Sequence, residues 1–401
     1  MEKAKRRERG TGTITPLKDG RYRARLQYVS SSDGKVHDKS KVCATDKEAA
    51  RILRVWAKEM AQETYVDVKK ESVEKFMTNW LVTVKKPDLK PTSYDRLELT
   101  INKHIAPYIG NMQMGAITSD MIQQHLNKLQ TEGKGYSTVK KVYDAFNSCF
   151  KWGVASRKLQ YNPMDAVVVP GAAKRRRKGK TKVVQRNPVK YLTVEQQDKL
   201  IEAALEKYPT GTPIYRFGYV IPFLLNTGLR LGELLALQWK RDVNLEERYI
   251  TVNNSLVLVK NREAGEEKRT DLLEQDSVKS DAGERTIYLN DEALDALNHL
   301  YELTGTQTYV LSTKQGKTVQ PSNIERMMRT ALIRAGLPTG NGYSPHALRH
   351  SFATNLFRKG VDVKVVSEIL GHSDVSVTLN IYTHVLEDQK KDALIKIADR
   401  K

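Results

Sequence analysis

A run of twenty residues in the middle of the chain, GAAKRRRKGKTKVVQRNPVK at 171–190, limits the folds open to this sequence. It carries nine lysines and arginines, no acidic residue and no hydrophobic periodicity, which is typical of a linker. A chain of 401 residues is long enough for two or three domains, so we expect this linker to separate domains. The predicted divisions are 1–66, 72–170, the linker 171–190, and 191–401.

The pattern of apolar residues differs between these segments and predicts a multidomain α+β fold. In RYRARLQYV, small and apolar residues face one way, while Arg21, Arg23 and Arg25 face the other. A hairpin turn and a helix follow, so the first segment should form a small three-stranded sheet backed by one helix. The second segment shows only helical spacing. The last segment mixes short strands with a majority of helices and ends in a tail helix.

The formal net charge of +20 is concentrated in two stretches. Residues 1–42 contribute +7 and residues 171–190 contribute +9, and such clustering fits a polyanionic partner such as DNA. A solvated tail and a solvated linker are the alternative interpretation of these charges. The basic residues that we expect to contact DNA are Arg21, Arg23, Arg25, Lys140, Lys141, Lys174, Arg175, Arg176 and Arg177.

Other features argue against a membrane protein or a secreted one. The longest apolar run, YVIPFLL at 219–225, is too short to span a bilayer, and neither basic stretch is amphipathic. The N-terminus is charged and lacks the apolar stretch of a secretory signal. The two cysteines, Cys43 and Cys149, give neither a disulfide framework nor a zinc motif. We therefore expect a cytoplasmic protein.

The segment SPHALRHSFAT, at 344–354, places ionisable side chains on a helix that otherwise looks buried. His346, Arg349 and His350 lie among apolar residues at helical spacing, and burying such groups is costly unless something needs them there. His346 and Arg349 share a helix face, so we expect them to hold one phosphate. His346 and His350 also have the spacing of a zinc site. No metal is expected, because the glutamate that zinc proteases use is missing and the arginine would repel a cation.

Three further segments of the last domain add ionisable groups. LLNTGLRLGELL places Arg230 at the start of a helix, with Glu233 three residues later as an ion-pair partner. SVKSDAGERTIYL places Lys279 in a hairpin turn between two strands. ILGHSDVSVTLNIYTHV places His372 after the end of a helix and Tyr382 ten residues later. Each of these residues taken alone is more often structural than functional.

Together these side chains suit phosphoryl transfer to a tyrosine. Two arginines around one phosphate would stabilise the charge of a pentacoordinate transition state. A lysine or histidine can protonate a leaving 5′ oxygen, and a histidine can take the phenol proton. The tyrosine can then form a covalent intermediate that conserves the phosphodiester energy for religation. This chemistry needs no metal, no ATP and no other cofactor.

The motifs TGLRLGEL, VKSDAGERTI, HALRHSFAT and LGHSDVSVTLNIYTH resemble the conserved boxes of the tyrosine recombinase family, in the family's order. The segment HIAPYIGNMQMGAITSDMIQQHLNKL resembles the SAM-like core-binding domain of phage-type integrases. The first segment is similar to the arm-type DNA-binding domain of integrases from temperate phages and conjugative transposons. The resemblance covers nearly the whole chain and implies a mainly helical catalytic domain at 191–401.

The resemblance also implies roles for individual residues. It implies six catalytic residues, Tyr382, Arg230, Lys279, His346, Arg349 and His372, and two accessory ones, Glu233 and His350. Tyr382 would attack DNA to give a 3′-phosphotyrosine, and Lys279 would be the general acid. The charged stretch that precedes Lys279 is long, which leaves Lys260 and Lys268 as alternatives for the acid.

The function implied is site-specific integration and excision of a mobile element, such as a prophage or a conjugative transposon. The implied partners are double-stranded DNA with core and arm attachment sites, three further protomers in a tetramer on a Holliday junction, and an excisionase or DNA-bending protein. The implied setting is the nucleoid of a bacterial cell, with a bacterial or phage gene. Two alternatives remain open: a type IB topoisomerase, and a DNA-binding regulator that keeps the fold without the activity.

Overall fold

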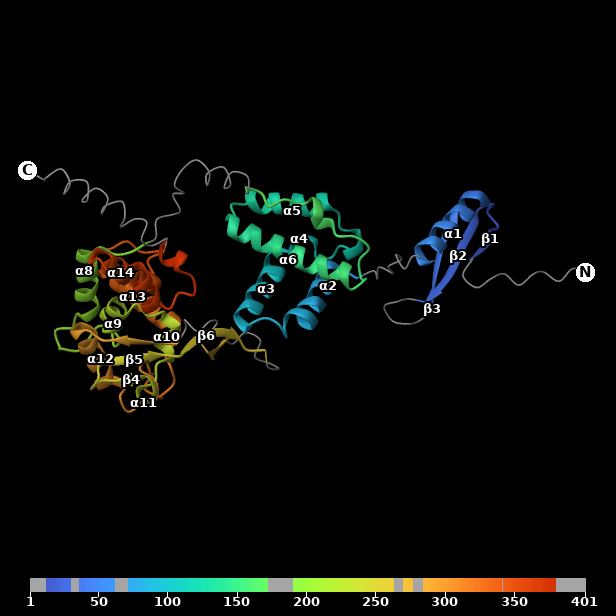
Figure 1. Ribbon diagram of the computed structural model, residues 1–401. Helices are drawn as coiled ribbons and strands as arrows, with labels where there is room; N and C mark the ends of the chain where they lie inside the picture. Colours follow the sequence, from blue (N-terminus) through green and yellow to red (C-terminus); the bar gives the residue numbers. More distant parts are fainter. Residues whose placement is uncertain are drawn as a thin grey trace, which may run out of the picture. The chain divides into compact units, whose positions relative to one another are not determined.

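The computed structural model describes residues 12–29, 36–61, 71–171, 190–262, 270–276, 284–340 and 342–379 (Figure 1). The chain divides into two compact units, residues 1–183 and 184–401, and the division falls inside the basic stretch 171–190. Within the described residues, no helix is both long enough and apolar enough to cross a membrane.

The N-terminal end of the described chain is an antiparallel sheet with one helix packed on it. Its elements are β1 (Thr13–Pro16), β2 (Tyr22–Val29), β3 (Val36–Cys43) and α1 (Asp46–Ala61). The strands lie in the order β1-β2-β3, which confirms the predicted small three-stranded sheet. Alternation along β2 buries Ala24 and Leu26 against Leu53 and Trp56 of α1, and it leaves Arg23 exposed on the other face.

The rest of the first unit is helical. Its elements are α2 (Val73–Trp80), the π-helical turn η1 (Leu81–Lys85), α3 (Pro91–His104), α4 (Ala106–Ile109), η2 (Met114–Ala116), α5 (Ser119–Thr131), α6 (Tyr136–Ala155) and η3 (Pro163–Ala166). Hydroxyls of Ser72 and Thr118 accept backbone hydrogen bonds at the starts of α2 and α5, which are typical N-caps. The apolar faces meet in a core that includes Trp80, Phe146 and Phe150.

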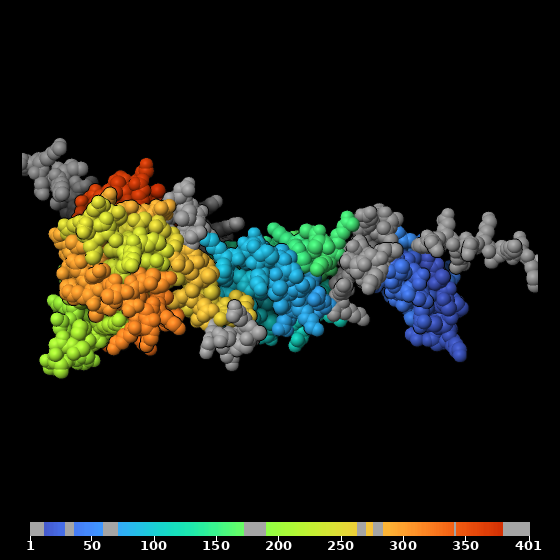
Figure 2. Space-filling view, turned by 90° about the horizontal axis from the view of Figure 1, so that it is seen from below, coloured from blue at the N-terminus to red at the C-terminus, as the bar shows by residue number. Residues whose placement is uncertain are grey.

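The second unit packs helices around a small antiparallel sheet. Its elements are α8 (Val194–Leu205), α9 (Val220–Thr227), α10 (Leu231–Ala236), α11 (Trp239–Asp242), β4 (Val243–Asn244), β5 (Tyr249–Val252), β6 (Asn254–Lys260), β7 (Thr270–Asp276), β8 (Arg285–Tyr288), α12 (Asp291–Thr304), α13 (Pro321–Arg334), α14 (Pro345–Arg358) and α15 (Val363–Leu370). Helix α9 contacts α8, α12 and α14, and almost all of its side chains are buried, so it is the centre of the core. Figure 2 shows the face of this unit on which β4, β5 and α12 lie, in yellow and orange.

Two expectations about this unit are wrong. The apolar pattern predicts a helix over 213–227, but α9 begins only at Val220. The preceding segment turns instead, because the Ile214 amide bonds to the Glu206 carbonyl and Gly218 lies against α8, where a Cβ would be 2.1 Å from the Ala204 carbonyl oxygen.

The strands on either side of Lys279 do not form the predicted hairpin with each other. Strand β7 pairs with β6, and β8 pairs with β5 in the sheet β4-β5-β8. Strand β8 pairs with β5 because its buried Ile287 lies opposite the buried Ile250 in the core, and a local turn signal does not reveal such a partner.

Helix α9 ends at Gly228, which lies in the left-handed region with φ +64°. A Cβ at this position would be 2.3 Å from a ring carbon of Phe352 on α14. We therefore expect Gly228→Ala to lower the free energy of unfolding by about 2–4 kcal/mol, from backbone strain and overpacking together.

The matched control for this prediction is Gly211→Ala, because Gly211 also has positive φ, at +82°, but meets nothing within 4 Å. It should show only the backbone part of the loss, about 1 kcal/mol. Urea unfolding of both variants measures the difference. Equal losses would contradict the role of the contact with Phe352.

Candidate active site

Among the described charged residues of the second unit, Arg349 is the most deeply buried, with 1% of its surface exposed. It lies on α14, and its Nη1 donates to the Gly228 carbonyl at 2.8 Å while Nη2 donates to the Leu370 carbonyl at 2.5 Å. Burial, and after it the positive charge of Arg230, lowers the pKa of Arg349 to about 9. The guanidinium therefore stays charged at neutral pH in a place that disfavours a cation.

Arg230 is the residue before the first turn of α10, and its side chain is 39% exposed. Its backbone amide and its Nη1 donate to the two carboxylate oxygens of Glu233, at 2.9 and 2.6 Å. Its Nη2 donates to the Gly371 carbonyl at 3.1 Å. The side chain is thus fixed at both ends of the guanidinium while part of it remains open to a ligand.

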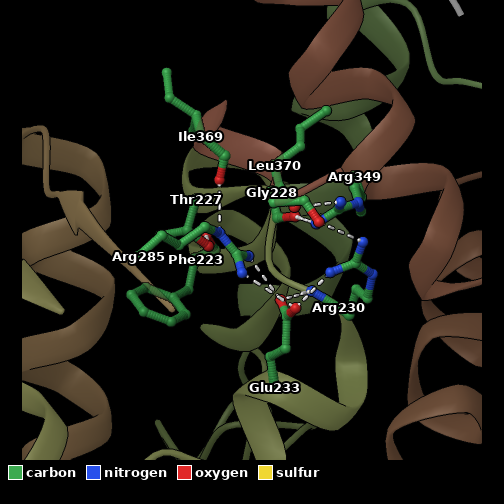
Figure 3. A network of polar contacts seen from close by, with 10 residues as sticks. Phe223, Thr227, Gly228, Arg230, Glu233, Arg285, Arg349, Ile369 and Leu370 are labelled. Carbon is green, nitrogen blue, oxygen red and sulfur yellow. Dashed lines mark hydrogen bonds and ion pairs between the residues drawn. The ribbon is translucent and has the colours of Figure 1, made fainter. Parts of the chain in front are cut away.

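The Glu233 carboxylate is shared between two arginines, as Figure 3 shows. Its side chain is 2% exposed, and Arg285 of β8, which is 7% exposed, binds it through Nη2 at 2.8 Å and Nη1 at 3.2 Å. Burial alone would raise the pKa of Glu233, but the hydrogen bonds from Arg285 and the charges of Arg285 and Arg230 lower it to about 2. The carboxylate is therefore ionised at neutral pH.

Sequence reasoning missed Arg285, although it lies within one of the motifs. The signal was the alternation of β8, where Arg285 occupies the same inward series as Ile287 and Leu289, both of which are buried. A charged residue at an inward strand position needs a partner, and here the partner is Glu233.

The end of α15 is where the three arginines meet. Three successive backbone carbonyls there accept a hydrogen bond from one guanidinium each. The pairs are Ile369 with Arg285, Leu370 with Arg349, and Gly371 with Arg230. Carbonyls in the last turn of a helix lack partners within the helix and carry the negative end of its dipole, so they suit cations.

Three histidines surround this cluster. The rings of His346 and His350, one turn apart on α14, lie with their centroids 4.4 Å apart. His372 directly follows the left-handed Gly371, and its Nδ1 shares a hydrogen bond of 2.7 Å with the Thr378 hydroxyl. His346 keeps an exposed edge, whereas His350 and His372 are partly buried.

The histidines are neutral at neutral pH. Burial, followed by the charges of Arg349 and Arg230, lowers the pKa of His346 and takes that of His372 to about 3. Burial, followed by the neighbouring His346, lowers the pKa of His350 to about 4. Neutral imidazoles can accept a proton, which is what a general base requires.

The cluster of Arg230, Glu233, Arg285 and Arg349 holds three guanidiniums against one carboxylate. This surplus of positive charge suits an anionic ligand with several oxygen atoms, such as a phosphodiester. Among the residues that the structure describes, no three His, Cys, Asp or Glu side chains are grouped to hold a metal ion.

Three of the predicted site residues or groups lie outside the described residues. They are Lys279, Tyr382, and the basic run Lys174, Arg175, Arg176 and Arg177. The structure does bring together the other predicted residues of the second unit. Arg230 and Glu233 bond to each other, and Arg230, Arg349, His346 and His350 all lie close enough to His372 to lower its pKa when they carry a charge.

The described residues of the first unit that we expect to contact DNA are exposed, but some of them are already paired with an acidic side chain. Arg21 pairs with Asp19 at 2.5 Å, and Arg25 pairs with Asp38 at 2.6 Å. Arg23 lies between them on β2, and no described side chain pairs with it. On α6, Lys140 pairs with Asp144 at 2.8 Å and Lys141 is exposed; these two lysines share one exposed stretch of the helix.

Two family models match the sequence. One, the phage integrase family, covers residues 190–389, and the other, the N-terminal SAM-like domain of phage integrases, covers residues 72–130. The chain belongs to the phage integrase family. Members of this family are tyrosine recombinases, so the protein is an enzyme that cleaves and rejoins DNA in site-specific recombination, as the motifs predict.

Curated relatives of this integrase match it over almost their whole length. It is 28% identical to a tyrosine recombinase XerC-like protein of Caldanaerobacter subterraneus subsp. tengcongensis, over 96% of this chain and 97% of that protein. It is 23% identical to the ICEBs1 integrase of Bacillus subtilis, over 96% of this chain and 99% of the relative.

Solved integrase structures share the fold. The Tn1549 transposon integrase in complex with transposon right end DNA matches with a TM-score of 0.61 and 19% identity, over 82% of this chain and 99% of that one. A lambda integrase in a tetramer bound to a Holliday junction matches with a TM-score of 0.55 and 17% identity, over 94% and 96%. These matches confirm the predicted multidomain α+β fold.

The neutral histidines predict that this integrase takes up protons when it binds a phosphate. The phosphate charge offsets the repulsion from Arg230 and Arg349, which after burial is the next cause of the low values, so the pKa values of His346 and His372 should rise on binding. DNA affinity should therefore increase as the pH falls toward 6.5. Calorimetric titrations in two buffers with different ionisation enthalpies measure the uptake.

His372→Asn distinguishes proton uptake at His372 from proton uptake at other groups of the protein. The variant should take up fewer protons than the wild type under the same conditions. A heat of binding that does not depend on the buffer in the wild type would contradict the prediction.

Proposed function

We propose that this integrase inserts and removes a mobile element by attacking DNA with Tyr382. The observation that supports the proposal most is the pair Arg349 and Arg230. Arg349 is buried and bound to carbonyls on both sides, and Arg230 is held by Glu233 with part of its side chain open. Two fixed guanidiniums at one place are suited to bind a scissile phosphate and the extra charge of its transition state.

The bonds exchanged in the proposed reaction balance without an external energy source. The Tyr382 phenol oxygen bonds to phosphorus as the bond from phosphorus to the 5′ oxygen breaks, which leaves a 3′-phosphotyrosine and a 5′ hydroxyl. The phenol proton passes to a neutral imidazole, and Lys279 donates a proton to the 5′ oxygen. Attack by a 5′ hydroxyl from another strand reverses these steps and rejoins the DNA.

The three histidines divide into two kinds of role in this proposal. His372 and His346 are neutral near pH 7, so either can accept a proton and then hydrogen-bond the phosphate as an imidazolium. His350, whose Nδ1 is buried without a hydrogen-bond partner among the described residues, supports His346 through the ring contact.

In this proposal each predicted domain has its own task on the DNA. Residues 1–66 bind arm-type sites through the face of β2 that carries Arg23, residues 72–170 bind the core site, and residues 191–401 carry the chemistry. Four protomers act on double-stranded DNA through a Holliday junction, and an excisionase or DNA-bending protein directs excision. The element is a prophage or conjugative transposon, and the integrase works at the nucleoid of a bacterial cell.

Covalent trapping on a randomised DNA duplex library tests the proposal. Each duplex carries a nick placed so that the fragment released by cleavage diffuses away and blocks religation. SDS-resistant complexes are collected and their DNA is sequenced. We expect adducts that are enriched for one core sequence.

The two alternative functions give different results in the same assay. Adducts without sequence preference would favour a topoisomerase. Strong DNA binding without any adduct would favour a regulator and would contradict the proposed function.

A further inference from the structure

Within the cluster, Arg285 binds both the Glu233 carboxylate and the end of α15. It lies on β8, far in sequence from Glu233 on α10 and from Ile369 at the end of α15, and it hydrogen-bonds to both (Figure 3). We propose that Arg285 is a positioning residue for strand cleavage, which aligns Arg230 and His372 by holding Glu233 and the end of α15 together. This inference rests on the proposed function, because the cleavage it affects is the one proposed above.

Arg285 completes the hydrogen bonding of Glu233. Each carboxylate oxygen accepts two hydrogen bonds: Oε1 from Nη1 of Arg230 and Nη1 of Arg285, and Oε2 from the Arg230 amide and Nη2 of Arg285. A carboxylate with all of its acceptor positions used cannot rotate. The direction of the Arg230 side chain, which is fixed by that carboxylate, therefore depends on Arg285.

Arg285 also anchors the residues that precede His372. Its Nε donates to the Ile369 carbonyl at 2.7 Å, and Ile369 lies three residues before His372. In Figure 3 the guanidinium of Arg285 lies between this carbonyl and the carboxylate of Glu233. The planar guanidinium of Arg285 thus connects the turn that carries His372 to α10, the helix that follows Arg230.

Neutralisation of the Glu233 charge does not by itself explain the presence of Arg285. Arg230 already provides Glu233 with an opposite charge at 2.6 Å, so a second buried cation adds desolvation cost and repels Arg349. What the second guanidinium adds is a fixed geometry, with three donors in one plane aimed at two different elements. A lysine has no such plane, so it cannot replace all three bonds.

Arg285→Ala tests the proposal on the core duplex that trapping recovers from the wild type. We expect the single-turnover cleavage rate at saturating protein to fall by about 10–100-fold, the range found when an outer partner of a functional side chain is removed. DNA affinity should change little, because the Arg285 side chain is only 7% exposed and so offers little surface to DNA. Guanidinium chloride at millimolar concentration should restore much of the rate by occupying the vacated site.

Three comparisons make the rescue specific. Urea has the shape of guanidinium without its charge, and sodium chloride matches its ionic strength, so neither should restore the rate. Arg241→Ala is the matched control variant: Arg241 also binds a buried carboxylate through two bonds, to Asp242 at 2.8 and 2.9 Å, and donates to the Ala236 carbonyl. It should lower the melting temperature without an equal loss of cleavage.

Any of three results would overturn the proposal: an unchanged cleavage rate in Arg285→Ala, equal restoration by urea or salt, or the same loss in Arg241→Ala. If Arg285→Ala does not fold, the same cleavage assay is made with Arg285→Lys. Cleavage by that variant at the wild-type rate would overturn the proposal. Failure of the wild type to form any adduct would instead contradict the proposed function, so the two failures are distinguishable.

Discussion

Tyr382→Phe is expected to abolish covalent adduct formation while leaving DNA binding intact. The substitution removes one oxygen atom, the one that would bond to phosphorus, and keeps the ring. The cleavage rate should fall on the order of 10⁴-fold or more, the scale observed when the nucleophile of a covalent enzyme is removed. Trapping on a nicked core duplex measures cleavage, and a gel-shift titration at fixed salt measures affinity.

The natural control for this substitution is another tyrosine of the second unit that is exposed and distant in sequence. Tyr288 is 78% exposed on β8, so Tyr288→Phe should cleave like the wild type. Adducts that persist in Tyr382→Phe would contradict the assignment of the nucleophile. Loss of DNA binding in that variant would also count against a purely catalytic role.

Arg349→Lys is expected to lower the cleavage rate by about 10²–10³-fold, the loss typical when one donor to a transition-state oxyanion is removed. Both terminal nitrogens of Arg349 are already committed, to the Gly228 and Leu370 carbonyls, so the planar group is held with its remaining edge in a fixed direction. A single ammonium cannot bind both carbonyls and present a second donor edge to a phosphate. Single-turnover cleavage at saturating protein measures the effect.

Arg358→Lys is the matched control for Arg349→Lys. Arg358 is the last residue of α14 and is exposed. Its substitution therefore makes the same arginine-to-lysine change on the same helix, but outside the cluster. It should leave the cleavage rate near that of the wild type. Comparable cleavage by Arg349→Lys and the wild type would show that the buried guanidinium does not bind the scissile phosphate.

The local parts of the site were predictable from the sequence. Arg230 and Glu233 are three residues apart at a helix start, and that spacing alone predicts the contact that the structure has. The helical spacing of 344–354 likewise predicts α14. His372 follows the left-handed Gly371, as expected of a residue after a helix end.

The contacts that join distant segments were not predictable in the same way. Arg285 and Glu233 are separated by 52 residues, and only the folded chain brings the Arg285 side chain of β8 to the Glu233 carboxylate of α10. The three carbonyls at the end of α15 are backbone groups, which no sequence motif identifies as acceptors. The strand partner of β8 depends on the core in the same way, through Ile287 and Ile250, which is why the prediction of a hairpin around Lys279 was wrong.

Mapping the DNA-linked residue in the trapped complex tests the central claim most directly. Digestion with trypsin should release residues 365–390, a peptide in which Tyr382 is the only tyrosine. After nuclease trimming, mass spectrometry should find a nucleotide joined to Tyr382 through a 3′ phosphate. A nucleotide on any other residue, or a link through a 5′ phosphate, would contradict the account.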